Sequence, residues 1–132
     1  MRVLVDTSVW SLSLRKGGPA KHPAVEKLAA LLRANEDVVL TGLILQEILQ
    51  GFRSDVAFRN VLRHLEPFPL LELDRRSCVA AASLHRRCAA RGVSVTTVDC
   101  QIATAAIHYD CVLLSADRDF ERIARLSDLK LA

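Results

Sequence analysis

The sequence predicts an α/β protein with a central, mostly parallel sheet of about four or five strands and helices on both of its faces, a three-layer α/β/α arrangement. Short apolar runs alternate along the chain with amphipathic segments of helical length, and clusters of glycine, proline and polar residues separate them. Because parallel neighbouring strands need a crossover connection, which is usually a helix, this alternation indicates a parallel sheet. A length of 132 residues without an internal repeat fits one domain over residues 1–132.

The first half of the chain opens with an apolar run that Asp6 ends, which predicts a strand followed by a helix. Two glycines and two prolines then mark an exposed loop, after which the spacing of Val25 and Leu28 predicts an amphipathic helix. Thr41 is the expected N-cap of the helix after the second strand. The expected elements are a strand over 2–5, a helix over 7–14, a loop over 15–23, a helix over 24–33, a strand over 38–40, and helices over 42–51 and about 55–64.

The second half of the chain begins after a break at Pro67 and Pro69. Asp74 is the expected N-cap of a long alanine-rich helix, and Gly92 suits the left-handed conformation that follows a helix C-terminus. Thr97 is the expected N-cap of the next helix. The expected elements are a strand over 70–73, a helix from 74 to 92, a helix over 98–109, a strand over 111–114, a helix over 117–126 and an edge strand over 129–131.

The composition is that of an ordinary globular protein, with 51% hydrophobic and 25% charged residues. Asp6 interrupts the apolar run at the N-terminus, which is far shorter than a secretory signal or a membrane span. We therefore expect a cytoplasmic protein without a membrane segment.

The four cysteines lie far apart and form no CxxC pair, so they are expected to be buried free thiols: Cys78, Cys88, Cys100 and Cys111. A zinc site built from Cys78, His85 and Cys88 is the alternative. It lacks the fourth ligand and the paired short spacings of a structural zinc site.

Glu47 lies on the apolar side of its expected helix. At about 100° per residue it falls between Leu43 and Ile44, whereas Gln46 and Gln50 take the polar side. Burying an unpaired carboxylate is costly, so Glu47 needs a cation or a strong hydrogen-bonding partner.

Asp99 faces inward on its expected helix by the same test. It shares a face with Ala103 and Ala106, whose small side chains let the helix approach the sheet closely. The opposite, polar face is expected to hold Gln101, Thr104 and His108.

Asp6 and Asp117 each follow an apolar strand, and ligands of parallel sheets bind outside the carboxyl ends of the strands. Each of the four carboxylates has an ordinary explanation when taken alone, such as helix capping or an arginine partner. Together on one sheet edge they would repel one another and raise one another's pKa. Their convergence therefore implies a bound metal ion.

Ligation by carboxylates alone favours Mg²⁺ or Mn²⁺ over zinc, and one or two ions are possible. Such a site suits phosphoryl transfer, because the ions activate water, orient the phosphodiester and neutralise charge on its oxygens. Hydroxyl groups next to the expected ligands are candidates for supporting contacts: Thr7, Ser8 and Ser115. Capping and turn formation are the alternative roles, above all for Ser8.

The distribution of charge indicates a polyanionic partner. The net charge is only +3, but setting apart Asp6, Glu47, Asp99, Asp117 and Asp119 leaves 10 of the 15 acidic residues to balance 18 basic ones. An acidic site within a basic surface suits a phosphate polymer. The candidate phosphate contacts are Arg15, Lys16, Lys21, Arg53, Arg59 and Arg118, each of which is otherwise an ordinary solvated side chain.

Four segments resemble the PIN domain, and specifically toxins of the VapC type. They are LVDTSVW at the N-terminus, QEILQG in the third expected helix, VDCQIATAA before the penultimate strand and VLLSADRDFERIA over and after it. The resemblance covers essentially the whole chain, in order and at appropriate spacing, and implies a PIN-like fold.

The resemblance implies a ribonuclease that hydrolyses RNA, with an acidic quartet holding Mg²⁺ or Mn²⁺: Asp6, Glu47, Asp99 and Asp117. Asp117 is expected as the fourth acid because it lies closer to the strand end, with Asp119 as an auxiliary ligand. By the same similarity the protein forms a homodimer and is silenced by a VapB-like antitoxin that lies in the active-site groove.

Other functions compete with the toxin interpretation. A PIN enzyme that processes RNA without an antitoxin has the same chemistry, and a non-catalytic RNA-binding module or receiver-like switch would use the acids only for structure. A phosphatase of the haloacid dehalogenase type needs a second aspartate two positions after the first, where this chain has Ser8.

Overall fold

The computed structural model describes residues 1–132 and contains five strands and seven helices. The strands are β1 (Arg2–Val5), β2 (Asp37–Thr41), β3 (Leu70–Leu71), β4 (Val112–Leu114) and β5 (Lys130–Leu131). The helices are α1 (Thr7–Ser13), α2 (Pro23–Arg33), α3 (Gly42–Gln50), α4 (Asp55–Leu65), α5 (Arg75–Ala90), α6 (Thr97–His108) and α7 (Asp119–Arg125).

The strands form one sheet in the order β3-β2-β1-β4-β5, and every neighbouring pair is parallel. This confirms the α/β class with a parallel central sheet. The register pairs Val5 at the end of β1 with Leu114 at the end of β4, and the Asp6 backbone N–H donates to the Leu114 carbonyl at 2.9 Å. The residues that follow these two central strands therefore leave the sheet side by side.

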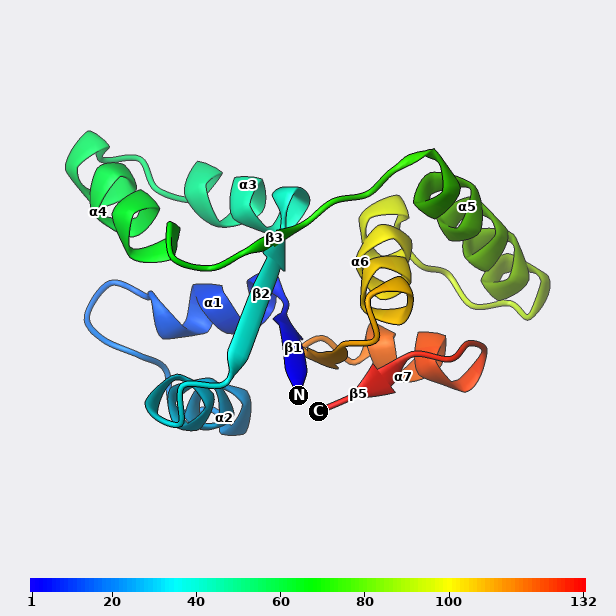
Figure 1. The fold of residues 1–132 in the computed structure, drawn as a ribbon, viewed down its shortest axis with the longest axis horizontal. Helices are drawn as coiled ribbons and strands as arrows, with labels where there is room; N and C mark the ends of the chain where they lie inside the picture. The colour runs from blue at the N-terminus through cyan, green and yellow to red at the C-terminus, as the bar shows by residue number, and fades with distance from the viewer.

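The helices form two layers that cover opposite faces of the sheet. The crossovers from β1 to β2 and from β2 to β3 move toward one edge of the sheet, whereas those from β3 to β4 and from β4 to β5 move toward the other edge. Because crossovers between parallel strands are right-handed, the two sets place their helices on opposite faces of the sheet. Figure 1 shows the corresponding two groups, with α1 to α4 on one side of the central strands and α5 to α7 on the other.

Helix α6 is covered by β4 on one side and by α5 on the other. This double cover corrects the expected polar face, because Thr104 is only 3% exposed whereas His108 is exposed. The N-cap is also corrected from Thr97 to Thr96, whose Oγ1 accepts from the Asp99 backbone N–H at 3.1 Å. The helix therefore begins at Thr97, one residue earlier than expected.

Smaller departures occur where the sequence pattern is weak. Cys78 is exposed on α5, whereas the other three cysteines are buried, so the expectation of burial was wrong for Cys78. Helix α7 begins at Asp119, and Asp117 instead accepts from the Asp119 backbone N–H at 2.9 Å in the turn before it. The third strand is limited to Leu70–Leu71.

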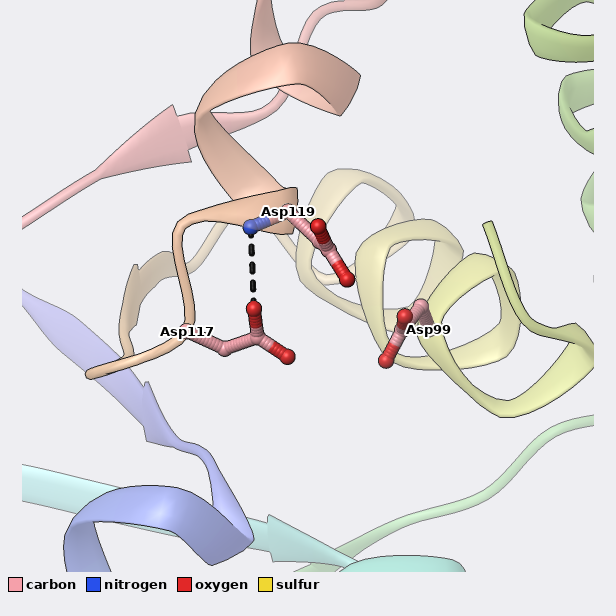
Figure 2. A group of neighbouring side chains, drawn as sticks. All are labelled: Asp99, Asp117 and Asp119. Atoms are coloured by element: carbon pink, nitrogen blue, oxygen red, sulfur yellow. Dashed lines mark hydrogen bonds between the residues drawn. The ribbon is translucent and has the colours of Figure 1, made fainter. Parts of the chain in front are cut away.

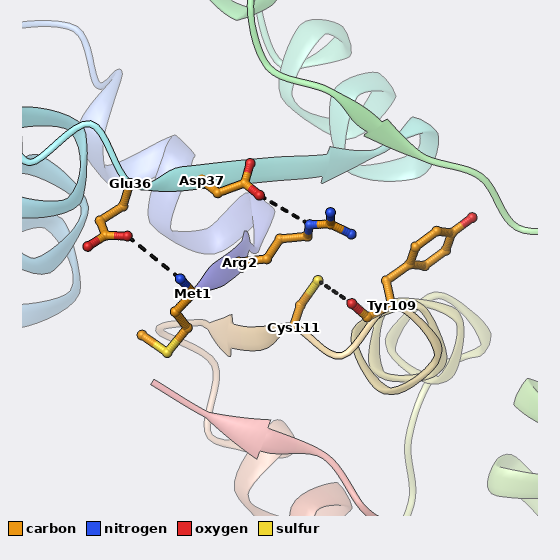
Figure 3. Close-up of polar contacts among 6 residues, drawn as sticks. All are labelled: Met1, Arg2, Glu36, Asp37, Tyr109 and Cys111. Atoms are coloured by element: carbon orange, nitrogen blue, oxygen red, sulfur yellow. Dashed lines mark hydrogen bonds and ion pairs between the residues drawn. The ribbon is translucent and has the colours of Figure 1, made fainter.

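The amino-terminal end of the sheet carries two exposed charge pairs and a contact from Cys111 Sγ to the Tyr109 carbonyl at 3.6 Å (Figure 3). Arg2 Nε lies 3.2 Å from Asp37 Oδ2, and the terminal ammonium of Met1 lies 3.9 Å from Glu36. Such solvated pairs contribute little stability. No helix is long and apolar enough to cross a membrane.

Candidate functional site

Asp6 occupies the end of β1 and is only 6% exposed. Its carboxylate oxygen Oδ2 accepts hydrogen bonds from Ser8 Oγ at 2.7 Å, Ser115 Oγ at 2.9 Å and the Ser8 backbone N–H at 3.4 Å. The last contact makes Asp6 the N-cap of α1. Asp6 therefore caps a helix and also lies among the expected acids. All three donors contact Oδ2, which leaves Oδ1 without a protein donor.

The two serines also connect β1 to the segment after β4. The Ala116 backbone N–H donates to Ser8 Oγ, and the Asp117 backbone N–H donates to Ser115 Oγ, both at 3.0 Å. These contacts hold the segment that carries Asp117 against the residues that orient Asp6. Ser8 and Ser115 are thus placed as supporting residues beside two of the expected acids.

Glu47 reaches the same edge from α3, which Thr41 caps as predicted. It is half-buried while Gln46 and Gln50 are exposed, as the helical periodicity indicates. Thr7 Oγ1 donates to Glu47 Oε1 at 2.9 Å. This hydrogen bond connects Glu47 to the residue next to Asp6. It also gives the partly buried Glu47 carboxylate one of the hydrogen-bonding partners that burial requires.

Asp99, Asp117 and Asp119 bring their carboxylates into one space between α6 and the turn before α7 (Figure 2). One oxygen from each lies within 4.8 Å of the others. Asp99 and Asp119 are half-buried, and Asp117 is exposed. Asp119 also forms an ion pair with Arg122, one turn further along α7.

The pKa of Asp99 is raised above its ordinary value, chiefly because burial disfavours the charged carboxylate. Hydrogen bonding to Thr96 opposes this shift, and the negative charges of Asp117 and Asp6 add to it. The influence of both acids places Asp99 within the electrostatic reach of Asp6 as well as of Asp117. The edge therefore carries mutually repelling carboxylates.

The donor set fits a hard divalent cation. Oxygen ligands lie about 2.1 Å from an octahedral Mg²⁺, so adjacent ligand oxygens are about 3.0 Å apart and opposite ones about 4.2 Å apart. The oxygens of Asp99, Asp117 and Asp119 lie within 4.8 Å of one another, so these side chains would have to draw closer to bind one ion together. No histidine or cysteine belongs to the group.

The expected phosphate contacts separate into two places. Arg15, Lys16 and Arg53 line a groove of about 860 Å³ beside α1, α3 and α4, and Glu47 lines it too. Arg118 instead lines a smaller cavity of about 240 Å³ with His22, Ser115 and Asp117. Lys21 and Arg59 line neither cavity.

Sequence reasoning missed two residues that act on the acids. Thr96 bonds to Asp99, and adjacent threonines at 96 and 97 gave no means of choosing between them. Arg122 pairs with Asp119, and its position three residues later on a helix was the available signal.

The profile of the PIN domain matches residues 3–126. The chain is 31% identical to the VapC ribonuclease Mb1587 of Mycobacterium bovis and to the ribonuclease VapC11 of Mycobacterium tuberculosis. Each alignment covers 98% of this chain and 97% of the relative.

Two crystal structures share the fold over nearly the full length. VapBC2 from Rickettsia felis, bound to a DNA fragment from its promoter, matches with a TM-score of 0.79 and 16% identity, over 100% of this chain and 98% of that chain. FitAcB from Neisseria gonorrhoeae matches with a TM-score of 0.73 and 22% identity, over 98% and 95%.

Proposed function

The chain belongs to the PIN-domain family, and from this premise we propose that it is a metal-dependent endoribonuclease, the toxin of a VapBC-type toxin-antitoxin pair. The observation that carries the proposal is the gathering of carboxylate oxygens within 4.8 Å at the carboxyl edge of the sheet. Full-length similarity to curated VapC ribonucleases supports the same activity.

The catalytic residues in this proposal are Asp6, Glu47, Asp99 and Asp117, which hold Mg²⁺ or Mn²⁺ with Asp119 as a further ligand. Bound there, the ion supplies positive charge for phosphate oxygens and activates water for attack on phosphorus. Carboxylate-only donors favour these two ions over zinc.

The chain's own residues keep this arrangement in place before RNA arrives. Ser8 and Ser115 fix one oxygen of Asp6 and leave the other available. Thr7 donates a hydrogen bond to Glu47, which lines the groove beside α1, α3 and α4. Side chains already held in position need no reorganisation when charge develops on the reacting phosphate.

The proposed partners are an RNA substrate, a VapB-like antitoxin and a second copy of the chain. The solved neighbours from Rickettsia felis and Haemophilus influenzae are VapBC assemblies, which supports an antitoxin partner for this chain. We place the activity in the cytoplasm, where the RNA substrate lies, and in a single domain over residues 1–132.

The test is to express the parent chain and Asp6→Asn and map new 5′ ends across cellular RNA. The parent is expected to generate discrete new ends, and the variant is expected to generate none. Asp128→Asn, a substitution of an exposed acid outside the site, is the matched control and should cut like the parent. Cleavage by Asp6→Asn at the parental rate would contradict the assignment.

A further inference from the structure

Helix α5 and the turn after it carry positive charge without any negative charge to balance it. No acidic residue lies between Asp74 and Asp99, a stretch that contains five arginines. All five are exposed, and the four ion pairs of the chain involve other residues. Figure 1 shows α5 at the outer end of the molecule, beyond α6. The helix therefore presents its charge to solvent and not to the rest of the protein.

The arginines of α5 form two pairs within the exposed half of the helix. Arg75 and Arg76 lie in its first turn, and Arg86 and Arg87 lie eleven residues further along. Eleven residues make about three helical turns, so each arginine of the second pair lies within about 20° of its counterpart and about 16 Å further along the axis. The Arg87 guanidinium is also anchored, because it donates to the Leu126 carbonyl at 2.9 Å. A straight helix thus holds two cationic points at a fixed spacing.

Helix stability does not account for the first pair. The amino-terminal end of a helix carries partial positive charge, so cations in the first turn are unfavourable. Asp74 caps this end, but neither Arg75 nor Arg76 forms an ion pair with it. These two arginines are therefore candidates for contact with a partner.

The partner that fits this face is a double-helical nucleic acid. Arginine side chains bind phosphate oxygens, and binding releases counterions from the polyanion. Proteins that hold single strands add aromatic side chains on which the bases stack, but residues 69–108 contain no phenylalanine, tyrosine or tryptophan. Double-helical RNA needs no such platform, because it is recognised mostly through its shape, its phosphates and its 2′-hydroxyl groups.

The second arginine pair lies at the end of α5 that is close to the acidic site. A cleft of about 450 Å³ between α5 and α6 is lined by His85 and Arg86 from one helix and by Thr97 and Gln101 from the other. Thr97 and Gln101 belong to the amino-terminal end of α6, which also carries Asp99. A duplex lying along α5 therefore has one end near the carboxylates.

We infer that α5 docks the double-helical part of a structured RNA, with Arg75, Arg76, Arg86 and Arg87 on its phosphates. The single-stranded loop that adjoins this duplex then reaches the carboxylates. The inference rests on the proposed ribonuclease function for the choice of RNA. The docking face belongs to the layer of helices opposite to α1, α3 and α4.

The first measurement is the affinity of the full chain for an RNA duplex of about 16 base pairs, by fluorescence anisotropy in chelator, which prevents metal-dependent cleavage. For Arg75→Ala/Arg76→Ala and for Arg86→Ala we expect Kd to rise about tenfold and about threefold, respectively. The slope of log Kd against log salt should weaken by about 0.9 per lost contact. Lys27→Ala/Arg33→Ala, at exposed positions of α2 in the other helix layer, is the charge-matched control and should keep the parental Kd.

The second measurement compares cleavage of a stem-loop RNA with cleavage of its loop sequence as a linear strand. Arg75→Ala/Arg76→Ala should raise KM for the stem-loop about tenfold, keep kcat within about threefold and leave KM for the linear strand unchanged. Removing cations from the first turn does not weaken the helix, so the melting temperature should not fall.

The outcomes separate this inference from the proposed function. If the parent cleaves no RNA, the ribonuclease proposal fails, and the duplex-binding measurement still tests the docking face. If both α5 variants keep the parental Kd and salt dependence, the docking inference fails. It also fails if the variants lose the same factor of affinity for single-stranded RNA or for a DNA duplex. A changed sedimentation coefficient of the free variants would overturn it too, because α5 would then join two copies of the chain.

Discussion

The carboxyl edge of the sheet contains two acidic regions built in opposite ways. Around Asp6, three hydrogen bonds converge on one carboxylate oxygen, and two serines connect β1 to the segment after β4. Around Asp99, the carboxylates of Asp117 and Asp119 face one another, and only Asp119 has a basic partner. In the first region hydrogen bonds hold one oxygen of the acid and leave the other oxygen without a donor, whereas the second region gathers three carboxylates with one basic partner, an arrangement that a bound cation would stabilise.

The largest expected effect is that metal binding stabilises the region around Asp99. At free Mg²⁺ or Mn²⁺ of about 100 times the dissociation constant, the free energy of unfolding should rise by about 2.7 kcal/mol per site. Thermal melting with added metal and with chelator measures this gain. Asp99→Asn should lose most of it, and Asp128→Asn should retain it. If the melting temperature of the parent is the same with added metal and with chelator, the distinction between the two regions is contradicted.

The next effect concerns the region around Asp6. Ser8→Ala removes one donor to Asp6 and the acceptor of the Ala116 backbone N–H, so Asp6 is held less firmly, by Ser115 Oγ and one backbone N–H. We expect a fall of about 10- to 100-fold in kcat/KM, with weaker apparent metal affinity. Ser13→Ala in the same helix is the matched control. If Ser8→Ala and Ser13→Ala have the same kcat/KM and the same apparent metal affinity, the hydrogen bonds to Asp6 do not position its carboxylate as a metal ligand.

The smallest effect is on the pH dependence of stability without metal. The pKa of Asp99 is raised in the folded protein. The contribution of this carboxyl group to the free energy of unfolding is therefore fully present at pH values below its ordinary pKa, and it is lost as pH rises through the pKa of the folded state. Asp99→Asn lacks this loss, so its stability relative to the parent should increase as pH rises above the ordinary pKa of aspartate, about 4. Urea unfolding in chelator measures the difference. Parallel curves would show that the Asp99 carboxylate is not destabilised by burial and by its neighbours.

The fold and the placement of the acids at one sheet edge were largely accessible from sequence because they depend on periodicity and strand ends. Helical periodicity placed Glu47 on the inward side, and the termination of apolar runs placed Asp6 and Asp117 at one sheet edge. These signals are local, and the parallel topology then brings distant residues to the same edge.

The errors arose where tertiary packing decides the outcome. Thr104 is buried because α5 covers the outer side of α6, and no local pattern reveals that cover. Thr96 rather than Thr97 caps α6, since two adjacent threonines offer equivalent chemistry. The hydrogen bonds from the two serines to Asp6 likewise depend on the pairing of β1 with β4.

That pairing also determines when the proposed site can form during synthesis. Ser115 lies 109 residues after Asp6, so a ribosome must produce most of the polypeptide before the two can meet. A nascent chain that has released β1, α1 and α3 still lacks Asp99 and Asp117. The proposed site can therefore form only after most of the chain has been made.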